Sequence, residues 1–184
     1  MGTVATWTAG TTTGATMATA HNALANAANT VGQYSQLATV ALTTTPTAVP
    51  FTSNDTQAGG ISHSTTTNTT RFVAGAAGVY NFVVQPQVSH LTTGTGDSTF
   101  WLRLNGTTPV ANSAAKYREN GALGSAVMLI VAPITMAAAD YIEVMAVASV
   151  VSEYELTYTA GSGAGATAIP NTPSIICTVT ALPV

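Results

Sequence analysis

The sequence predicts an all-β protein, an antiparallel jelly-roll sandwich that follows an N-terminal extended arm and one short helix. From Leu37 onward, Thr and Val are abundant and turn residues recur about every ten residues, which is typical of short strands. No helical pattern separates these segments, so a parallel α/β sheet is excluded and a sandwich or jelly roll remains. Several segments also alternate apolar with polar residues, as half-buried strands do.

The alternation is clearest in residues 78–89 and 97–105. Because side chains of a strand point to opposite faces in turn, one face of each segment is expected to enter the core. The expected core positions are Tyr80, Phe82, Val84, Val88, Phe100, Leu102 and Leu104. Trp101 falls on the face opposite to Phe100, which predicts that it is exposed, at a subunit interface or in a binding patch, and burial at an interface is preferred.

Further strands are expected at 38–43, 48–52, 71–74, 110–117, 126–135, 141–149 and 174–180. The segment 126–135 is apolar on both faces, which predicts a strand that is buried on both sides. The glycine-rich stretch 161–166 is expected to be a flexible loop. It is not a phosphate-binding loop, since Pro170 and Pro173 follow it and exclude the helix that such a loop requires.

Composition changes near residue 36, and this divides the chain into an attachment segment, 1–36, and a jelly-roll domain, 37–184. Residues 1–15 lack the periodic apolar content needed for a core and predict an extended arm with one large anchor, Trp7. Residues 17–31 predict the helix, in which Met17, Leu24 and Val31 belong to an Ala-rich stripe and Gly32 ends it. Such a short helix is marginal alone, so it needs a partner surface.

Charge excludes several functions. Only 6% of the 184 residues are charged, whereas an average domain is roughly one-quarter charged. The four basic residues, Arg71, Arg103, Lys116 and Arg118, form no stripe for nucleic acid and no polybasic patch for a membrane surface. The chain begins without a secretory signal. A weakly charged surface of Thr, Ser, Asn and Gly favours a protein that works in an assembly.

No catalytic constellation is visible, so the chain is expected to be no enzyme and to use no cofactor. Glu153 and Glu155 could form a paired-carboxylate site, but a solvated strand edge is the preferred interpretation. The histidines His21, His63 and His90 lack metal-ligand spacing, although His63 and His90 could meet near a threefold axis. Cys177 is alone in an apolar segment and predicts a small buried side chain.

Five short motifs occur in the order found in one known family. They are Val-Pro-Phe-Thr at 49–52, Gly-x-Tyr-x-Phe-x-Val at 78–84, Leu-x-Leu-Asn-Gly at 102–106, Ala-Asp-x-Ile-x-Val at 139–144 and Ser-Ile-Ile-Cys-Thr-Val at 174–179. In this order the chain resembles the trimeric jelly rolls of the tumour-necrosis-factor-like and complement globular-head type, which also occur in phage decoration and fibre-head proteins. The resemblance implies a homotrimer with its N-terminal arms gathered on one side.

A second resemblance concerns the N-terminus. Thr-Trp-Thr-Ala-Gly at 6–10, followed by Thr-Met-Ala-Thr-Ala-His-Asn at 16–22, is similar to the opening of many phage structural proteins. There, a Trp-x-x-Gly turn precedes a short helix that contains an Asn. Together the two resemblances imply a structural virion protein of a tailed bacteriophage.

The preferred hypothesis is a trimeric capsid decoration, or cement, protein. It would be made in the host cytoplasm and would bind the major capsid protein on the outer surface of the head. The expected attachment residues are Trp7, Met17, Leu24 and Val31, and the expected trimer-interface residues are Trp101, Val127, Leu129 and Val131.

The alternative is a receptor-binding tip or fibre head that recognises a host surface glycan or protein. Recognition would then be carried by the loops at 94–97, 116–120 and 152–166. The same fold serves both functions, so fold does not separate them. The short arm and the lack of a repetitive shaft favour decoration. A secreted eukaryotic ligand of the same fold is disfavoured by the missing signal peptide.

Overall fold

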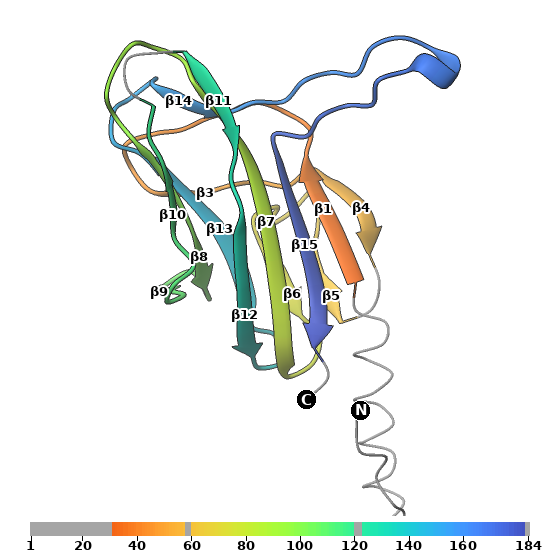
Figure 1. The fold of residues 1–184 in the computed structure, drawn as a ribbon. Coiled ribbons are helices and arrows are strands. Elements are labelled where there is room, and N and C mark those ends of the chain that lie inside the picture. Colours follow the sequence, from red (N-terminus) through yellow and green to blue (C-terminus); the bar gives the residue numbers. More distant parts are fainter. Residues whose placement is uncertain (1–30, 58–59, 120–122, 183–184) are drawn as a thin grey trace, which may run out of the picture.

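The computed structural model describes residues 31–57, 60–119 and 123–182, and they form two antiparallel sheets packed face to face (Figure 1). The first sheet runs from β4 (Ser53–Gln57) through β1 (Val31–Gln36), β15 (Ile175–Leu182) and β7 (Gly78–His90) to a free edge made by β12 (Ile130–Met136) and β11 (Gly124–Val127). Two short strands, β14 (Tyr154–Leu156) and β2 (Val40–Ala41), continue it beside the end of β7.

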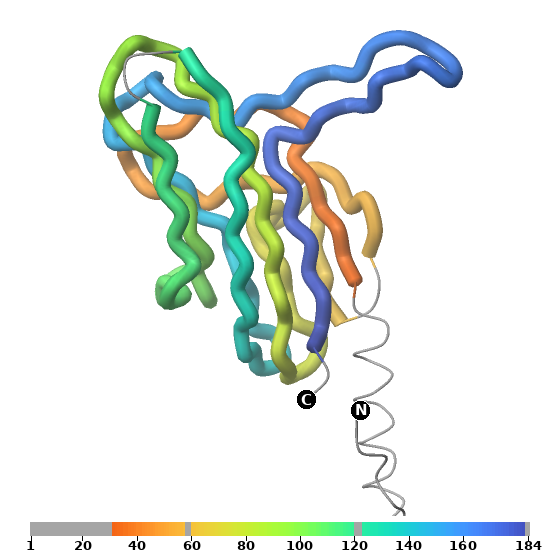
Figure 2. Tube along the Cα trace, in the orientation of Figure 1, coloured from red at the N-terminus to blue at the C-terminus, as the bar shows by residue number. Residues whose placement is uncertain are grey.

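The second sheet runs in the order β10 (Ala115–Tyr117), β8 (Ser98–Leu104), β13 (Tyr141–Ala148), β6 (Phe72–Ala74) and β5 (Ile61–Ser62). In addition, β3 (Thr47–Ala48) pairs with β13 and β9 (Thr108–Pro109) pairs with β8. The chain passes repeatedly from one sheet to the other (Figure 2). The predicted jelly-roll sandwich is therefore confirmed.

The core lies between the sheets and is built by the alternation read from the sequence. The even-numbered apolar residues of β7 and residues Phe100 and Leu102 of β8 are all fully buried, whereas Leu104 is half-buried at the strand end. Burying such side chains is the main driving force for folding.

One aromatic cluster is the densest part of this core. The Phe72 ring lies at its centre, with its centroid 4.9 Å from Phe51, 5.0 Å from Tyr34, 5.1 Å from His63 and 6.3 Å from Phe82. These rings come from β6, β1, β7 and two loops, so the cluster ties both sheets together.

The segment 31–36 departs from the prediction. Val31 and Gly32 were expected at the end of a helix in the attachment segment, but they belong to β1, which pairs with β15 on one side and β4 on the other. The boundary expected at residue 36 thus falls inside the sandwich. The physical reason is Tyr34, whose ring is fully buried in the aromatic cluster and holds this segment in the sheet. Residues 1–30, with Trp7, Met17 and Leu24, lie outside the described residues.

Other strand predictions were wrong in extent. Of the strand expected at 48–52, only Ala48 lies in a strand, at the end of β3. Val49 and Phe51 are buried from the irregular segment that follows, in which Pro50 lacks the amide that a strand would use. The strand expected at 126–135 is two strands, since the chain breaks at residues 128–129. Those expected at 38–43 and 110–117 are reduced to short pairings, and β1, β4, β5 and β14 were not predicted.

The glycine-rich stretch forms the tip of a long hairpin. Isolated bridges join Thr159 to Thr172 and Ser162 to Ile169, and the tip is a 3-10 turn at Gly165–Thr167. Residues 159–171 are all exposed, and the hairpin extends away from the sheets (Figure 2). No helix in the described part of the chain is long and apolar enough to cross a membrane.

Candidate assembly face and loop network

Three neighbouring rows on the outer face of the first sheet carry no charged residue. Cross-strand register places Val131 beside Val83, Val83 beside Thr178, and Thr178 beside Gln33. The next row is Pro133, Asn81, Thr180 and Val31, and the row after it is Thr135, Val79 and Leu182. All these residues belong to the set that alternates with the core positions of their strands. We call the eleven residues of these three rows the assembly face.

Its free edge exposes large aliphatic side chains. Val127, Leu129 and Val131 are 65%, 60% and 54% exposed, and Leu123 just before β11 is 71% exposed. Contiguous exposed aliphatic side chains of this kind are typical of interaction sites. The structure therefore brings three of the four expected trimer-interface residues together, on the edge of one sheet. In the single chain this segment is buried on one face only.

Trp101 does not join them. It lies on β8 in the second sheet, in register with Met145 of β13, whose side chain is buried on the outer face of that sheet. Alternation correctly placed Trp101 opposite Phe100, but alternation does not say to which sheet a strand belongs. Val31, expected to attach to the capsid, lies instead on the assembly face and is 47% exposed.

The outer face of the second sheet is charged instead. The Glu143 carboxylate is buried, with Oε2 accepting hydrogen bonds from Arg103 Nη2 at 2.7 Å and Nε at 3.2 Å, and Oε1 accepting one from Thr70 Oγ1 at 2.9 Å. Arg71 Nε lies 3.8 Å from Glu143 Oε1, and its guanidinium stacks over the Tyr141 ring at 4.4 Å. The two outer faces of the sandwich thus differ in chemistry, which indicates different surroundings.

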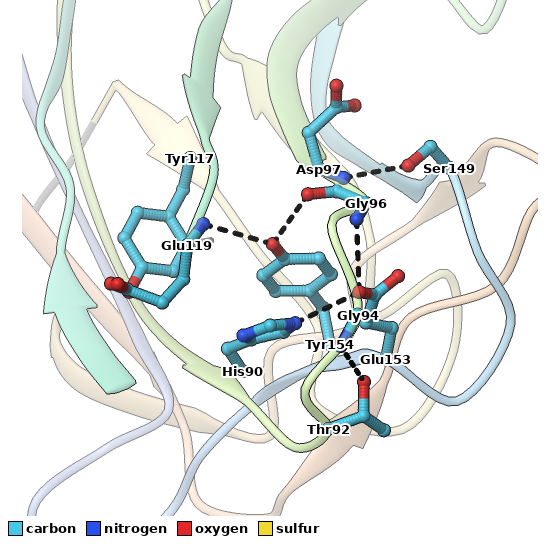
Figure 3. A network of polar contacts seen from close by, with 10 residues as sticks. All are labelled: His90, Thr92, Gly94, Gly96, Asp97, Tyr117, Glu119, Ser149, Glu153 and Tyr154. Carbon is cyan, nitrogen blue, oxygen red and sulfur yellow. Dashed lines mark hydrogen bonds and ion pairs between the residues drawn. The ribbon is translucent and has the colours of Figure 1, made fainter. Parts of the chain in front are cut away.

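A buried polar network shapes the loops at the end of the sandwich where β7 finishes (Figure 3). Its centre is Glu153, whose Oε1 lies 3.0 Å from His90 Nε2 and accepts a hydrogen bond of 3.0 Å from the Gly96 amide. Both side chains are almost fully buried. The Tyr154 hydroxyl donates to the Gly96 carbonyl at 2.8 Å, and its ring stacks on His90 with centroids 4.7 Å apart.

The geometry around Glu153 requires glycine at two positions. A Cβ atom on Gly94 or on Gly96 would collide with the Glu153 carboxylate. The hydrogen bonds from His90 and from the Gly96 amide hold the pKa of Glu153 below its usual range. The network therefore locks the loop 94–97 onto the residues that precede β14.

A second loop joins through Asp97. Its Oδ2 lies 3.1 Å from Lys116 Nζ and 3.0 Å from Arg118 Nη2, and the hydrogen bond from Lys116 and that from Arg118 lower the pKa of Asp97. The Glu119 amide also donates to the Tyr154 hydroxyl at 3.3 Å. The structure thus joins the loops 94–97 and 116–119 to Glu153 and Tyr154, at the start of the third segment that the alternative hypothesis assigned to recognition. The rest of that segment extends away in the hairpin.

The residues weighed for chemistry are engaged elsewhere. Glu153 is enclosed in the network, while Glu155 accepts a hydrogen bond from Thr157 Oγ1 at 3.1 Å. His63 stacks on Phe72 in the aromatic cluster, whereas His90 stacks on Tyr154 in the loop network. The two histidines therefore belong to different clusters within the chain. Within the described ranges no group of three His, Cys, Asp or Glu residues could hold a metal. Cys177 is fully buried, and burial raises the pKa of its thiol.

His63 makes the fold sensitive to acid. Burial lowers the pKa of His63, and the Thr69 carbonyl that accepts a hydrogen bond from Nε2 at 3.0 Å offsets this only in part. The unfolded chain, with an ordinary pKa of 6.5 for this residue, therefore binds more protons than the native state below that pH. We expect the free energy of unfolding to fall as the pH drops below 6.5, and to fall again below 4.5 as Glu153 protonates.

Urea denaturation at pH 7.5 and at pH 5.5 measures this effect. The difference between the two pH values should shrink in His63→Gln, which cannot take up a proton. A variant that keeps the full difference would contradict the role of His63.

Comparison with known proteins agrees with the architecture. No protein-family model and no curated protein matches the sequence. Among the solved structures, the chain is similar to the globular domain of the zebrafish complement 1qA protein, with a TM-score of 0.52 and 15% identity over 81% of this chain and 94% of that one. At this identity the likeness shows the fold, which is the jelly roll that the motif order implied. As many as 208 solved chains match, so the fold alone does not identify a function.

Proposed function

We propose that this chain is a structural virion protein of a tailed bacteriophage, and specifically a homotrimeric capsid decoration protein that binds the major capsid protein on the outside of the head. In this proposal the jelly roll acts by binding other subunits and performs no catalysis. The single observation that carries it is the uncharged assembly face with its exposed edge of Val127, Leu129 and Val131.

Self-association explains this face in physical terms. Covering aliphatic groups removes apolar surface from water, worth about 25 cal/mol per Å². Since no charged side chain lies in the three rows, no ion must be stripped of water when a second copy covers them. Three copies around a shared axis would bury this face and leave the charged outer face of the second sheet in solvent.

Attachment to the capsid is assigned to the N-terminal segment. The chain enters the sandwich at Val31, which pairs with Thr180 at the end of β15, whereas the loop network lies at the opposite end of the sheet, where β7 reaches His90 (Figure 1). A trimer would present three copies of Trp7, Met17 and Leu24. Linked weak contacts of this kind gain affinity through effective concentration. Such a protein would strengthen the head without performing chemistry.

Binding to empty expanded heads tests the proposal. The full chain is compared with the double variant Trp7→Ala/Leu24→Ala and with the matched control Thr11→Ala/Thr13→Ala from the same segment. We expect the native chain and the control to cosediment with heads at a fixed copy number. The double variant should keep its thermal unfolding profile and lose at least about tenfold in affinity, as expected when anchor residues are removed.

The loop network favours one alternative, a receptor-binding tip. It joins the loops 94–97 and 116–119 to Glu153 at the end of the sandwich away from Val31, where a fibre head would meet its target. If the native chain fails to bind heads and instead binds host cells, decoration is wrong and the receptor-binding function replaces it.

A further inference from the structure

We propose that a groove on the outer face of the second sheet is a binding site for a carboxylate-bearing saccharide, with Arg71 as the residue that receives the carboxylate. The groove has a volume of about 500 Å³ and lies between the loop after β5 and the turn before β13. This volume is within the usual range of ligand pockets, about 300–1,000 Å³. Its lining includes Ser62, Ser64, Thr67, Asn68, Arg71 and Tyr141.

The first argument is the charge of Arg71. Arg103 binds Glu143 through two nitrogens, and Thr70 donates to the same carboxylate. Arg71 approaches it only through Nε at 3.8 Å, beyond hydrogen-bond distance. Among the described residues its guanidinium has no closer anionic partner, and its side chain is 38% exposed. Two guanidinium groups therefore face one carboxylate, and one positive charge remains at the groove.

The second argument is preorganisation. The Arg71 guanidinium lies over the Tyr141 ring, with Cζ 4.4 Å from the ring centroid, and this cation–π contact restrains the side chain before a ligand arrives. A planar guanidinium matches a carboxylate with two parallel hydrogen bonds. Asp140, which directly precedes Tyr141, is already bound by Asn105 Nδ2 at 2.8 Å and by the Ala137 amide at 2.7 Å, and it does not line the groove.

The third argument is the backbone of the groove. Asn68 and Ala139 line it from opposite sides, with φ of 51° and 69°. The left-handed region is unfavourable for alanine, so the surrounding structure enforces this conformation. The Asn68 loop is held by Ser64 Oγ, which accepts hydrogen bonds from the amides of Thr66 and Thr67. The backbone that forms the groove is therefore held in a defined conformation.

These features define the ligand class. Hydroxyl and amide groups from Ser62, Ser64, Thr67 and Asn68 suit sugar hydroxyls. A polyphosphate would need several cations, but Arg71 is the one cationic side chain in the lining described. An acidic sugar, such as a uronate, combines one carboxylate with several hydroxyls. Because the groove is on the sheet opposite the assembly face, it would stay open in a trimer, and it adds a ligand to the proposed structural role.

Isothermal titration of the full-length protein tests the site. The probes are a glucuronate-terminated oligosaccharide and its glucose-terminated analogue, which lacks only the carboxylate. The variants are Arg71→Gln and Arg71→Lys. The matched control is Arg118→Gln, which removes an exposed arginine from the distant loop network.

We expect the native chain and Arg118→Gln to bind the glucuronate probe at least about tenfold more tightly than the neutral probe. Arg71→Gln should abolish this preference, and Arg71→Lys, which keeps the charge without the planar pair of donors, should restore only part of it. Thermal unfolding checks that each variant is folded. The proposal is overturned if the native chain binds neither probe, if it binds both equally, or if Arg71→Gln keeps the preference.

Discussion

Replacing Phe72 with alanine is expected to lower the free energy of unfolding by about 3–5 kcal/mol, the usual cost of removing a buried phenylalanine. The ring is fully buried at the centre of the aromatic cluster, within about 5 Å of the rings of Tyr34, Phe51 and His63. These neighbours come from different strands and loops, so they cannot collapse together to fill the cavity.

Urea denaturation at fixed protein concentration measures the loss, since the stability of an oligomer depends on concentration. Val73→Ala is the matched control on the same strand, because Val73 points outward and is only half-buried. The control should lose less than half as much stability as Phe72→Ala. Equal losses would mean that the cluster is not the centre of the core.

Replacing Val131 with aspartate is expected to have the largest effect on assembly. Val131 is 54% exposed in the single chain and lies in the first row of the assembly face, beside Val83. A carboxylate there would have to lose its water in the trimer with no cation to meet it, because the face has no charged residue. Self-association should weaken by at least about tenfold, as for loss of a central interface residue.

Thr108→Asp is the control for Val131→Asp. Thr108 is exposed on β9 at the edge of the second sheet, so the same charge is added away from the assembly face. Size-exclusion chromatography with light scattering should find the control assembled and Val131→Asp dissociated but folded. If both variants stay assembled, the subunits meet through another surface.

The alternation of apolar and polar residues is a local property of a segment, and it predicts which face of a strand is buried. The buried faces of β7 and β8 follow from alternation in 78–89 and 97–105, since a strand has only two faces. The segment 31–36 shows the limit. Its strand character depends on pairing with β15, about 140 residues further along the chain, and a preceding Ala-rich stripe continued the helical spacing up to Val31.

The candidate sites show the same limit more strongly. The apolar segment 126–135 predicted an interface from sequence, and the structure shows that Val127, Leu129 and Val131 are exposed in the single chain. The absence of charge from the assembly face becomes visible only when β12, β7, β15 and β1 are placed side by side. His90 and Glu153, or Arg71 and Tyr141, carry no shared spacing signal, because folding alone brings each pair together.

The mass of the full-length protein in solution tests the central claim most directly, namely that the assembly face on the first sheet joins three copies. Sedimentation equilibrium of the native chain, between about 1 and 50 µM, covers the range in which a specific interface of standard size holds subunits together. The account predicts three times the mass of one chain, and a single-chain mass for Val131→Asp under the same conditions. A single-chain mass for the native protein across the whole range would contradict it.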